Sequence, residues 1–253
     1  MGARAPGDER RSRLSEGELR AGVIGVGALG RHHARVWASQ PGARLVGVLD
    51  RDGERAGAVA KEFGAAVFSD LGALLEATDA LSVAVDTVDH HSLARQAMEA
   101  GCDVLVEKPM TATLDEADDL VSLARDKGRV LQVGHIERFN PATDVLLDSV
   151  EGPRFVEVHR LGSFSARSLD IDVVLDLMIH DLDIILHLVR SDVAEIHAVG
   201  VPVLSPAEDI ANVRIAFANG CVANVSASRI SRERLRKIRV FQSDTYVSLD
   251  LSL

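Results

Sequence analysis

Cysteine is scarce in this chain: Cys102 and Cys221 are the two present among 253 residues. Neither belongs to a Cys-x-x-Cys pair, so the sequence lacks both a disulfide framework and the usual cysteine spacing of a zinc site. Both fall in apolar segments that we expect to be strands. This usage is typical of buried thiols in a protein of the reducing cytoplasm.

Long apolar runs and an excess of positive charge are also missing. No apolar run approaches the length of a membrane-spanning helix, so we expect no membrane partner. The formal net charge is −10, whereas a general nucleic-acid binder carries a basic surface. Residues 1–20 are polar and arginine-rich without the apolar segment of a secretory signal, so we expect a mobile tail. Organelle targeting is the alternative, which the acids Asp8, Glu9, Glu16 and Glu18 disfavour.

A glycine fingerprint is the most informative feature that is present. Gly25, Gly27 and Gly30 follow the apolar segment 21–24 and open a helical pattern that runs to Ser39. In a dinucleotide-binding fold the first glycine allows a tight turn, the second admits the pyrophosphate and the third lets the helix pack on the strand. The alternative is an ordinary strand–turn–helix with incidental glycines. The candidate cofactor contacts at this turn are Gly25, Gly27, Ala28, Leu29 and Gly30.

An acid follows the fingerprint at the expected distance. Asp50 ends the next apolar segment, about 20 residues beyond the last glycine. A carboxylate there accepts hydrogen bonds from the adenosine ribose and repels the 2′-phosphate of NADP. The neighbouring Arg51 can instead accept that phosphate. We therefore expect NAD as the cofactor and keep NADP as the alternative.

Strand and helix patterns alternate over residues 21–138. Their apolar strands are nearly continuous, which predicts a parallel sheet covered on both faces. Thr113 with Glu116 has the pattern of a helix capping box. This part is therefore expected to be a Rossmann dinucleotide-binding domain.

The pattern changes over residues 139–253. Here we expect one helix at 173–188 among alternating strands, with a hairpin at Asn219-Gly220. The expected fold class is thus α/β: an N-terminal Rossmann domain followed by an α+β substrate and dimerisation domain with a mainly antiparallel open sheet. The chain ends on the strand pattern 247–251, so we expect a domain truncated at its C-terminus or an edge covered by a partner.

Lys108 is the first candidate for chemistry. It lies in Glu107-Lys108-Pro109, at the carboxyl end of the fifth expected strand. Ligands of open α/β sheets bind beyond these strand ends. A lysine there can donate a hydrogen bond to a substrate hydroxyl and favour its deprotonation. The alternative is a surface lysine before a turn proline.

Asp176 and His180 form the second candidate. Their i,i+4 spacing puts both side chains on one face of the expected helix. A carboxylate beside an imidazole favours a protonated ring, and histidine suits proton exchange with an alcohol. The alternative is the solvated face of an amphipathic helix. No second ligand set has metal-site spacing, so no metal is expected.

Two basic features complete the candidates. Arg138 and Asn140 lie where the two patterns meet and could line a cleft between domains, or belong to a linker with a structural salt bridge. A basic stretch further on could meet a phosphate-bearing substrate, or be a solvated strand and turn. Its residues are Arg229, Arg232, Arg234, Arg236, Lys237 and Arg239.

In combination these residues resemble the Gfo/Idh/MocA family of nicotinamide-dependent sugar oxidoreductases. The resemblance covers nearly the whole chain after the tail, with Val88 standing where the family usually has proline. It rests on the glycine fingerprint with Asp50, on 83–87 followed by His91, on Gly101 with 104–109, on Arg138-Phe139, and on Asp176 with His180.

The resemblance implies an enzyme that moves a hydride between a secondary alcohol of a sugar or nucleotide sugar and NAD(P). Lys108 matches the active-site lysine, often before a cis proline; Asp176 matches the substrate-binding carboxylate and His180 the acid/base histidine. It also implies a homodimer or homotetramer. Further implied contacts are Thr87, His91 and Glu107 with the cofactor, and Arg138 and Asn140 with the substrate.

Residues 133–141 and 174–181 look like one branch of the family, which oxidises the 3-hydroxyl of UDP-N-acetylglucosamine. The basic stretch would then meet a diphosphate. Two other classes stay open: a non-catalytic dinucleotide-sensing protein, and a reductase of a non-sugar carbonyl.

Overall fold

A computed structural model describes residues 17–164 and 171–251 of the chain. Residues 1–16 of the expected N-terminal tail lie outside this description, and the first strand already begins at Leu19. None of the described helices has the length and apolarity that crossing a bilayer requires.

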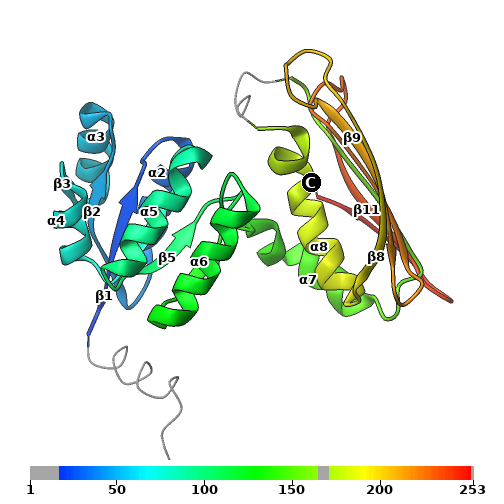
Figure 1. The fold of residues 1–253 in the computed structure, drawn as a ribbon, viewed down its shortest axis with the longest axis horizontal. Coiled ribbons are helices and arrows are strands. Elements are labelled where there is room, and N and C mark those ends of the chain that lie inside the picture. The colour runs from blue at the N-terminus through cyan, green and yellow to red at the C-terminus, as the bar shows by residue number, and fades with distance from the viewer. Residues whose placement is uncertain (1–16, 165–170, 252–253) are drawn as a thin grey trace, which may run out of the picture. The chain divides into compact units, whose positions relative to one another are not determined.

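The chain divides into two compact units, the first ending at Gly134 and the second beginning at His135 (Figure 1). The sequence pattern placed this division after Arg138 instead. The short 3₁₀ helix η1 (Ile136–Phe139) therefore belongs to the second unit.

The first unit is a parallel sheet of six strands with helices on both faces (Figure 1). Its strand order, β3-β2-β1-β4-β5-β6, is that of a doubly wound dinucleotide-binding fold, which confirms the predicted Rossmann domain. The elements are β1 (Leu19–Ile24), α2 (Ala28–Ser39), β2 (Ala43–Leu49), α3 (Gly53–Phe63), β3 (Ala66–Phe68), α4 (Leu71–Ala77), β4 (Ala80–Val83), α5 (Thr87–Glu99), β5 (Asp103–Val106), α6 (Leu114–Lys127) and β6 (Leu131–Val133).

Both faces of this sheet are apolar. Neighbouring strand residues point to opposite sides, so consecutive apolar residues cover both faces. Val23 of β1 packs in the cluster under α2 and α3, and Ile24 packs in the cluster under α4, α5 and α6. The predicted capping box of α6 is present, with the Thr113 side chain accepting from the Glu116 backbone N–H. The local sequence thus sets both the sheet and the helix that follows β5.

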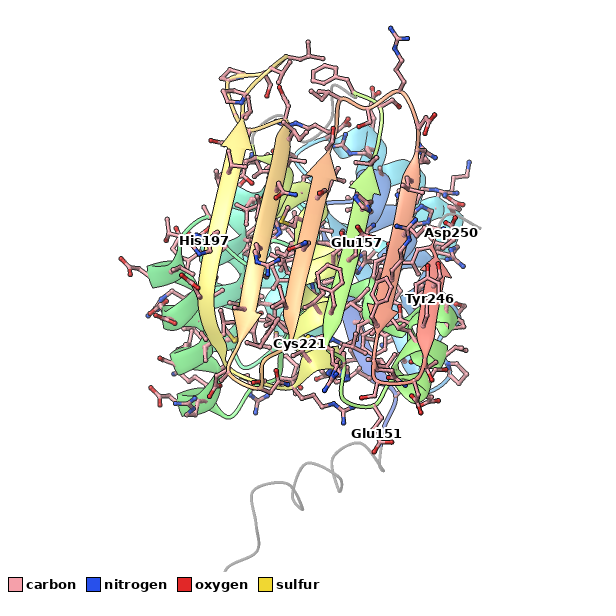
Figure 2. The ribbon with its side chains drawn as sticks, turned by 90° about the vertical axis from the view of Figure 1, so that its right-hand side faces the viewer. Glu151, Glu157, His197, Cys221, Tyr246 and Asp250 are labelled. Carbon is pink, nitrogen blue, oxygen red and sulfur yellow. The ribbon has the colours of Figure 1, made fainter. Side chains whose placement is uncertain are left out.

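In the described part of the second unit, a six-stranded sheet carries helices on one face only (Figures 1 and 2). Its order is β12-β11-β7-β10-β9-β8; β7 and β10 run parallel and the other neighbours antiparallel, as predicted for a mainly antiparallel open sheet. The elements are η1, α7 (Pro141–Ser149), β7 (Phe155–Leu161), the π-helix η2 (Val174–Met178), α8 (Ile179–Val189), β8 (Val193–Val201), β9 (Ile210–Phe217), β10 (Val222–Ser228), β11 (Leu235–Phe241) and β12 (Tyr246–Asp250).

Two expectations for this unit were incomplete. α7 was missed, although Asn140 caps it and Pro141 takes its first turn, a typical start signal. The helix expected at 173–188 is instead a π turn followed by α8, because the Ile179 N–H bonds to the Val174 carbonyl. The Asn219-Gly220 hairpin joins β9 to β10 as predicted, with Gly220 at φ 86°.

The two cysteines are buried and free. Each lies immediately before a strand, Cys102 before β5 and Cys221 before β10, rather than within the strand as expected. Burial raises the pKa of both thiols, so they stay protonated at neutral pH.

Candidate active site

The glycine turn lies between β1 and α2, where the strand order of the first sheet reverses. Gly25 has φ 79°, a conformation that side chains disfavour. A Cβ on Gly30 would lie 1.7 Å from the carbonyl oxygen of Gly25, so only glycine lets α2 approach this closely. A Cβ on Gly27 would meet open space among the described residues. The turn therefore leaves room for a pyrophosphate against the start of α2.

Asp50 lies at the end of β2, beside this turn. Its carboxylate accepts hydrogen bonds from the backbone N–H of Val26 at 2.7 Å and of Asp52 at 2.8 Å. It also accepts from the guanidinium of Arg55 at 2.6 Å. Burial acts to raise the pKa of Asp50, but these hydrogen bonds hold it below its ordinary value. The carboxylate is thus ionised, and Arg55 is a neighbour that the sequence did not predict.

The side chains of three other expected cofactor contacts lie in different local environments within the first unit. Arg51 forms an ion pair with Asp89 at 3.0 Å and is otherwise exposed. The Nε2 of His91 lies 2.8 Å from the carboxylate of Asp119 on α6. Thr87 is buried as the first residue of α5. Each of these side chains is held within the first unit.

Hydrogen bonds of Glu107 connect helix α2 to Lys108. It is buried after β5 and accepts a hydrogen bond from the Nε2 of His33, on α2, at 2.8 Å. It also accepts from the backbone N–H of Lys108 at 3.2 Å. Burial acts to raise the pKa of Glu107, but the hydrogen bond and charge of His33 lower it below its ordinary value. A Cβ on Gly134 would lie 3.1 Å from this carboxylate, so Glu107 needs the glycine there.

Lys108 is half-buried, and its peptide bond to Pro109 is cis. His90 holds the loop: its Nδ1 lies 2.8 Å from the Pro109 carbonyl oxygen, and its Nε2 lies 3.1 Å from that of Val85. For the neighbouring His91 the sequence predicts a cofactor contact. The spacing of His90 to Ala94, both on the buried face of α5, is the signal that His90 packs inward.

In the second unit, Asp176 lies in the π turn of η2 and His180 in the first turn of α8. Both are half-buried. The π turn between them replaces the regular α-helical spacing that the sequence suggested. Such turns are rare and often mark functional sites.

Arg138 and Asn140 are engaged in the local structure of the second unit. The guanidinium of Arg138 donates to the carboxylate of Asp183 on α8, with Nε at 3.1 Å. The Asn140 side chain accepts from the backbone N–H of Ala142 at 3.0 Å and caps α7. A salt bridge of this kind is what the linker interpretation of Arg138 predicts.

The basic stretch divides into separate contacts. Arg239 pairs with Glu157 at 2.7 Å on the open face of the sheet. Arg229, Arg234 and Arg236 line a cavity of about 150 Å³ in the second unit, to which Asp176 also contributes. The cavity therefore brings a predicted substrate-binding carboxylate together with guanidinium groups.

The first unit has the features of a dinucleotide-binding protein: a doubly wound sheet, the glycine turn and the ionised Asp50. Residues 19–135 match the model described as an oxidoreductase family with an NAD-binding Rossmann fold, and residues 153–247 match the GFO/IDH/MocA C-terminal domain. The chain belongs to the Gfo/Idh/MocA family of NAD-binding oxidoreductases. The predictions of an enzyme, and of NAD as its cofactor, are thereby confirmed.

The chain is similar to several characterised relatives. It is 44% identical to the UDP-N-acetylglucosamine 3-dehydrogenase of Acidithiobacillus ferrooxidans over 233 residues, 92% of this chain and 74% of the relative. It is 30% identical to the scyllo-inositol 2-dehydrogenase (NAD(+)) of Bacillus subtilis, over 85% of this chain and 69% of the relative. The solved structure of the A. ferrooxidans enzyme superposes with a TM-score of 0.87, covering 92% of this chain and 76% of that one.

Proposed function

We propose that this enzyme oxidises the 3-hydroxyl of UDP-N-acetylglucosamine with NAD. The observation that carries the proposal is the 44% identity to the A. ferrooxidans enzyme, which extends over 92% of the chain and so includes both units. When bound, NAD supplies the acceptor for the hydride that leaves the carbinol carbon. The remaining chemistry belongs to the side chains of the protein.

Three residues carry that chemistry in the proposal. The imidazole of His180 accepts the proton of the reacting hydroxyl. The ammonium group of Lys108 stabilises the negative charge that develops on the same oxygen. Asp176 accepts hydrogen bonds from sugar hydroxyls and so orients the ring. The division of proton transfer between Lys108 and His180 is left open.

The cofactor is held by the first unit in this proposal. The pyrophosphate binds the backbone of Gly27, Ala28 and Leu29 at the start of α2. Asp50 faces the adenosine ribose, and its charge disfavours the 2′-phosphate of NADP. Arg55, paired with Asp50, offsets part of that repulsion.

The direct test is NADH formation by the purified protein with UDP-N-acetylglucosamine. We expect turnover, with a kcat/KM for NAD roughly tenfold above that for NADP, the effect of about 1.4 kcal/mol of like-charge repulsion. Free N-acetylglucosamine, scyllo-inositol and myo-inositol serve as comparison substrates. Turnover of an inositol without turnover of the nucleotide sugar would reject the proposed substrate. A clear preference for NADP would reject the role of Asp50.

We further propose that the enzyme acts in the cytoplasm as a homo-oligomer that pairs through the open face of the second sheet. Figure 2 shows this face, with Glu157, His197 and Tyr246 on it. An aromatic pair supports the proposal: the ring of Phe241 lies 5.0 Å from that of Tyr246, centroid to centroid, and Tyr246 is 54% exposed. Light scattering after gel filtration should give a multiple of 27.1 kDa. A single-chain mass at micromolar concentration would reject this assembly.

A further inference from the structure

The helix-facing side of the second sheet changes from apolar to charged at one end. Val158 of β7 and Ile238 of β11 are cross-strand partners, and both are buried in the core beneath α8. The next pair on the same face is Arg160 opposite Arg236. An arginine pair thus occupies a position where the preceding pairs are apolar, and both arginines line the cavity described above.

The two arginines of this pair have unequal carboxylate partners. Arg160 is 3% exposed and binds the carboxylate of Asp181 in bidentate fashion, at 2.7 and 2.8 Å. Glu137 lies 3.4 Å from Arg160 and 3.7 Å from Arg236, so one carboxylate serves both. Like charges directly opposite each other on neighbouring strands are destabilising. Arg236 has the weaker carboxylate contact of the two, and an anion in the cavity would give it a second negatively charged partner.

Arg229 lines the cavity and is held in place by hydrogen bonds. It is buried, and it donates to Asp209 at 2.8 Å, to the Ile171 carbonyl and to the Ser205 hydroxyl. Burial acts to raise the pKa of Asp209, but Arg229 and the backbone N–H groups of Leu204, Val203 and Ser205 hold it well below its ordinary value. The guanidinium of Arg229 is therefore already paired with a carboxylate inside the second unit.

Two guanidinium groups keep donors for a ligand. Arg236 lies 3.7 Å from Glu137, beyond hydrogen-bond distance, and its side chain is 41% exposed. Arg234 is exposed immediately before β11 and makes no hydrogen bond or ion pair with any residue in the described ranges. The cavity therefore presents cationic donors that the described protein does not saturate.

We propose that Arg234 and Arg236 bind the diphosphate of the nucleotide-sugar substrate in this cavity. The proposal rests on the proposed function and specifies how that substrate is selected. Guanidinium groups match phosphate oxygens in bidentate geometry, and a carboxylate such as Asp176 matches sugar hydroxyls. In a nucleotide sugar the two chemical groups are adjacent, because the diphosphate is attached to the anomeric carbon.

The size of the cavity agrees with this assignment. Pockets for complete small ligands commonly have about 300–1,000 Å³. A cavity of about 150 Å³ holds a charged linkage rather than the whole molecule. A neutral ligand, such as an inositol, would bring no negative charge to Arg234 and Arg236.

The test uses the full-length variants Arg234→Gln and Arg236→Gln, with Arg232→Gln as the control. Arg232 is an exposed arginine of the same segment that does not line the cavity. The Kd of UDP is measured by titration calorimetry, and the kinetics are measured with UDP-N-acetylglucosamine. We expect each cavity variant to raise the Kd and the KM about 10- to 100-fold, the usual effect of a lost charge-assisted hydrogen bond. kcat and the Kd of NAD should change little, and the control should behave as the wild type.

The outcomes separate this inference from the proposed function. Normal turnover of UDP-N-acetylglucosamine with unchanged UDP binding in both cavity variants would overturn the diphosphate site and leave the proposed function intact. Arginine-dependent UDP binding without turnover of the nucleotide sugar would support the site and overturn the proposed reaction. Failure of UDP to bind the wild-type protein would overturn the site. Because Arg234 is exposed, its replacement should leave the unfolding midpoint unchanged, so loss of binding in that variant reports on the site.

Discussion

Replacing Lys108 or His180 with alanine is expected to lower kcat by about 10²- to 10⁴-fold, the usual contribution of a positioned acid, base or charge-stabilising group. Neither residue belongs to the glycine turn, so the Kd of NAD should stay near the wild-type value. Steady-state kinetics and fluorescence titration of NADH measure the two quantities separately. The result would show that binding of the cofactor and chemistry on the substrate depend on different residues.

One control lies on the same helix as His180, and the other on the helix that follows Lys108. His187 is an exposed histidine of α8, and Lys127 is the last residue of α6. Alanine at either position should leave kcat unchanged. A variant of Lys108 or His180 that retains wild-type kcat would remove that residue from the proposed mechanism. A parallel loss of NAD affinity would instead indicate a structural effect.

Replacing Arg160 with methionine is expected to lower the free energy of unfolding by about 3–5 kcal/mol. The change leaves Asp181, which is 1% exposed, without its bidentate partner. A buried carboxylate that loses its counter-ion pays the cost of desolvation without compensation. Urea unfolding followed by circular dichroism measures the difference.

The double variant Arg160→Met with Asp181→Leu distinguishes the charge effect from a packing defect. Because it removes both charges, it should recover much of the lost stability. Arg214→Ala removes an exposed guanidinium bonded to Asn224, and should change the free energy of unfolding by less than about 0.5 kcal/mol. Equal destabilisation of the single and double variants would show that packing, rather than the unpaired charge, determines the loss.

Features set by local sequence were predictable. The three glycines of the turn are close in sequence, and their roles depend on one strand and one helix. The Thr113 capping box and the Asn219-Gly220 hairpin are equally local. Each of these patterns has one low-energy backbone solution, so the residues alone indicate the structure.

Contacts between distant segments were not predictable. His33 meets Glu107 across 74 positions of sequence, and no spacing rule links them. Arg55 reaches Asp50 only because α3 folds back beside the end of β2. Arg160 belongs to no motif; its importance follows from the position of Asp181 on α8. The π turn at Asp176 was missed because helical periodicity does not distinguish a single wide turn.

Glu107 has a consequence for how substrate range can change in this enzyme. Its carboxylate joins α2, whose first residues follow the glycine turn, to the backbone of Lys108. One buried side chain therefore links the backbone of Lys108 to the helix that follows the glycine turn, and all of these residues belong to the first unit. The arginine cavity lies entirely in the other unit. If the cavity binds the diphosphate as proposed, substitutions there would change which nucleotide sugar binds and leave the glycine turn and Lys108 of the first unit unaltered.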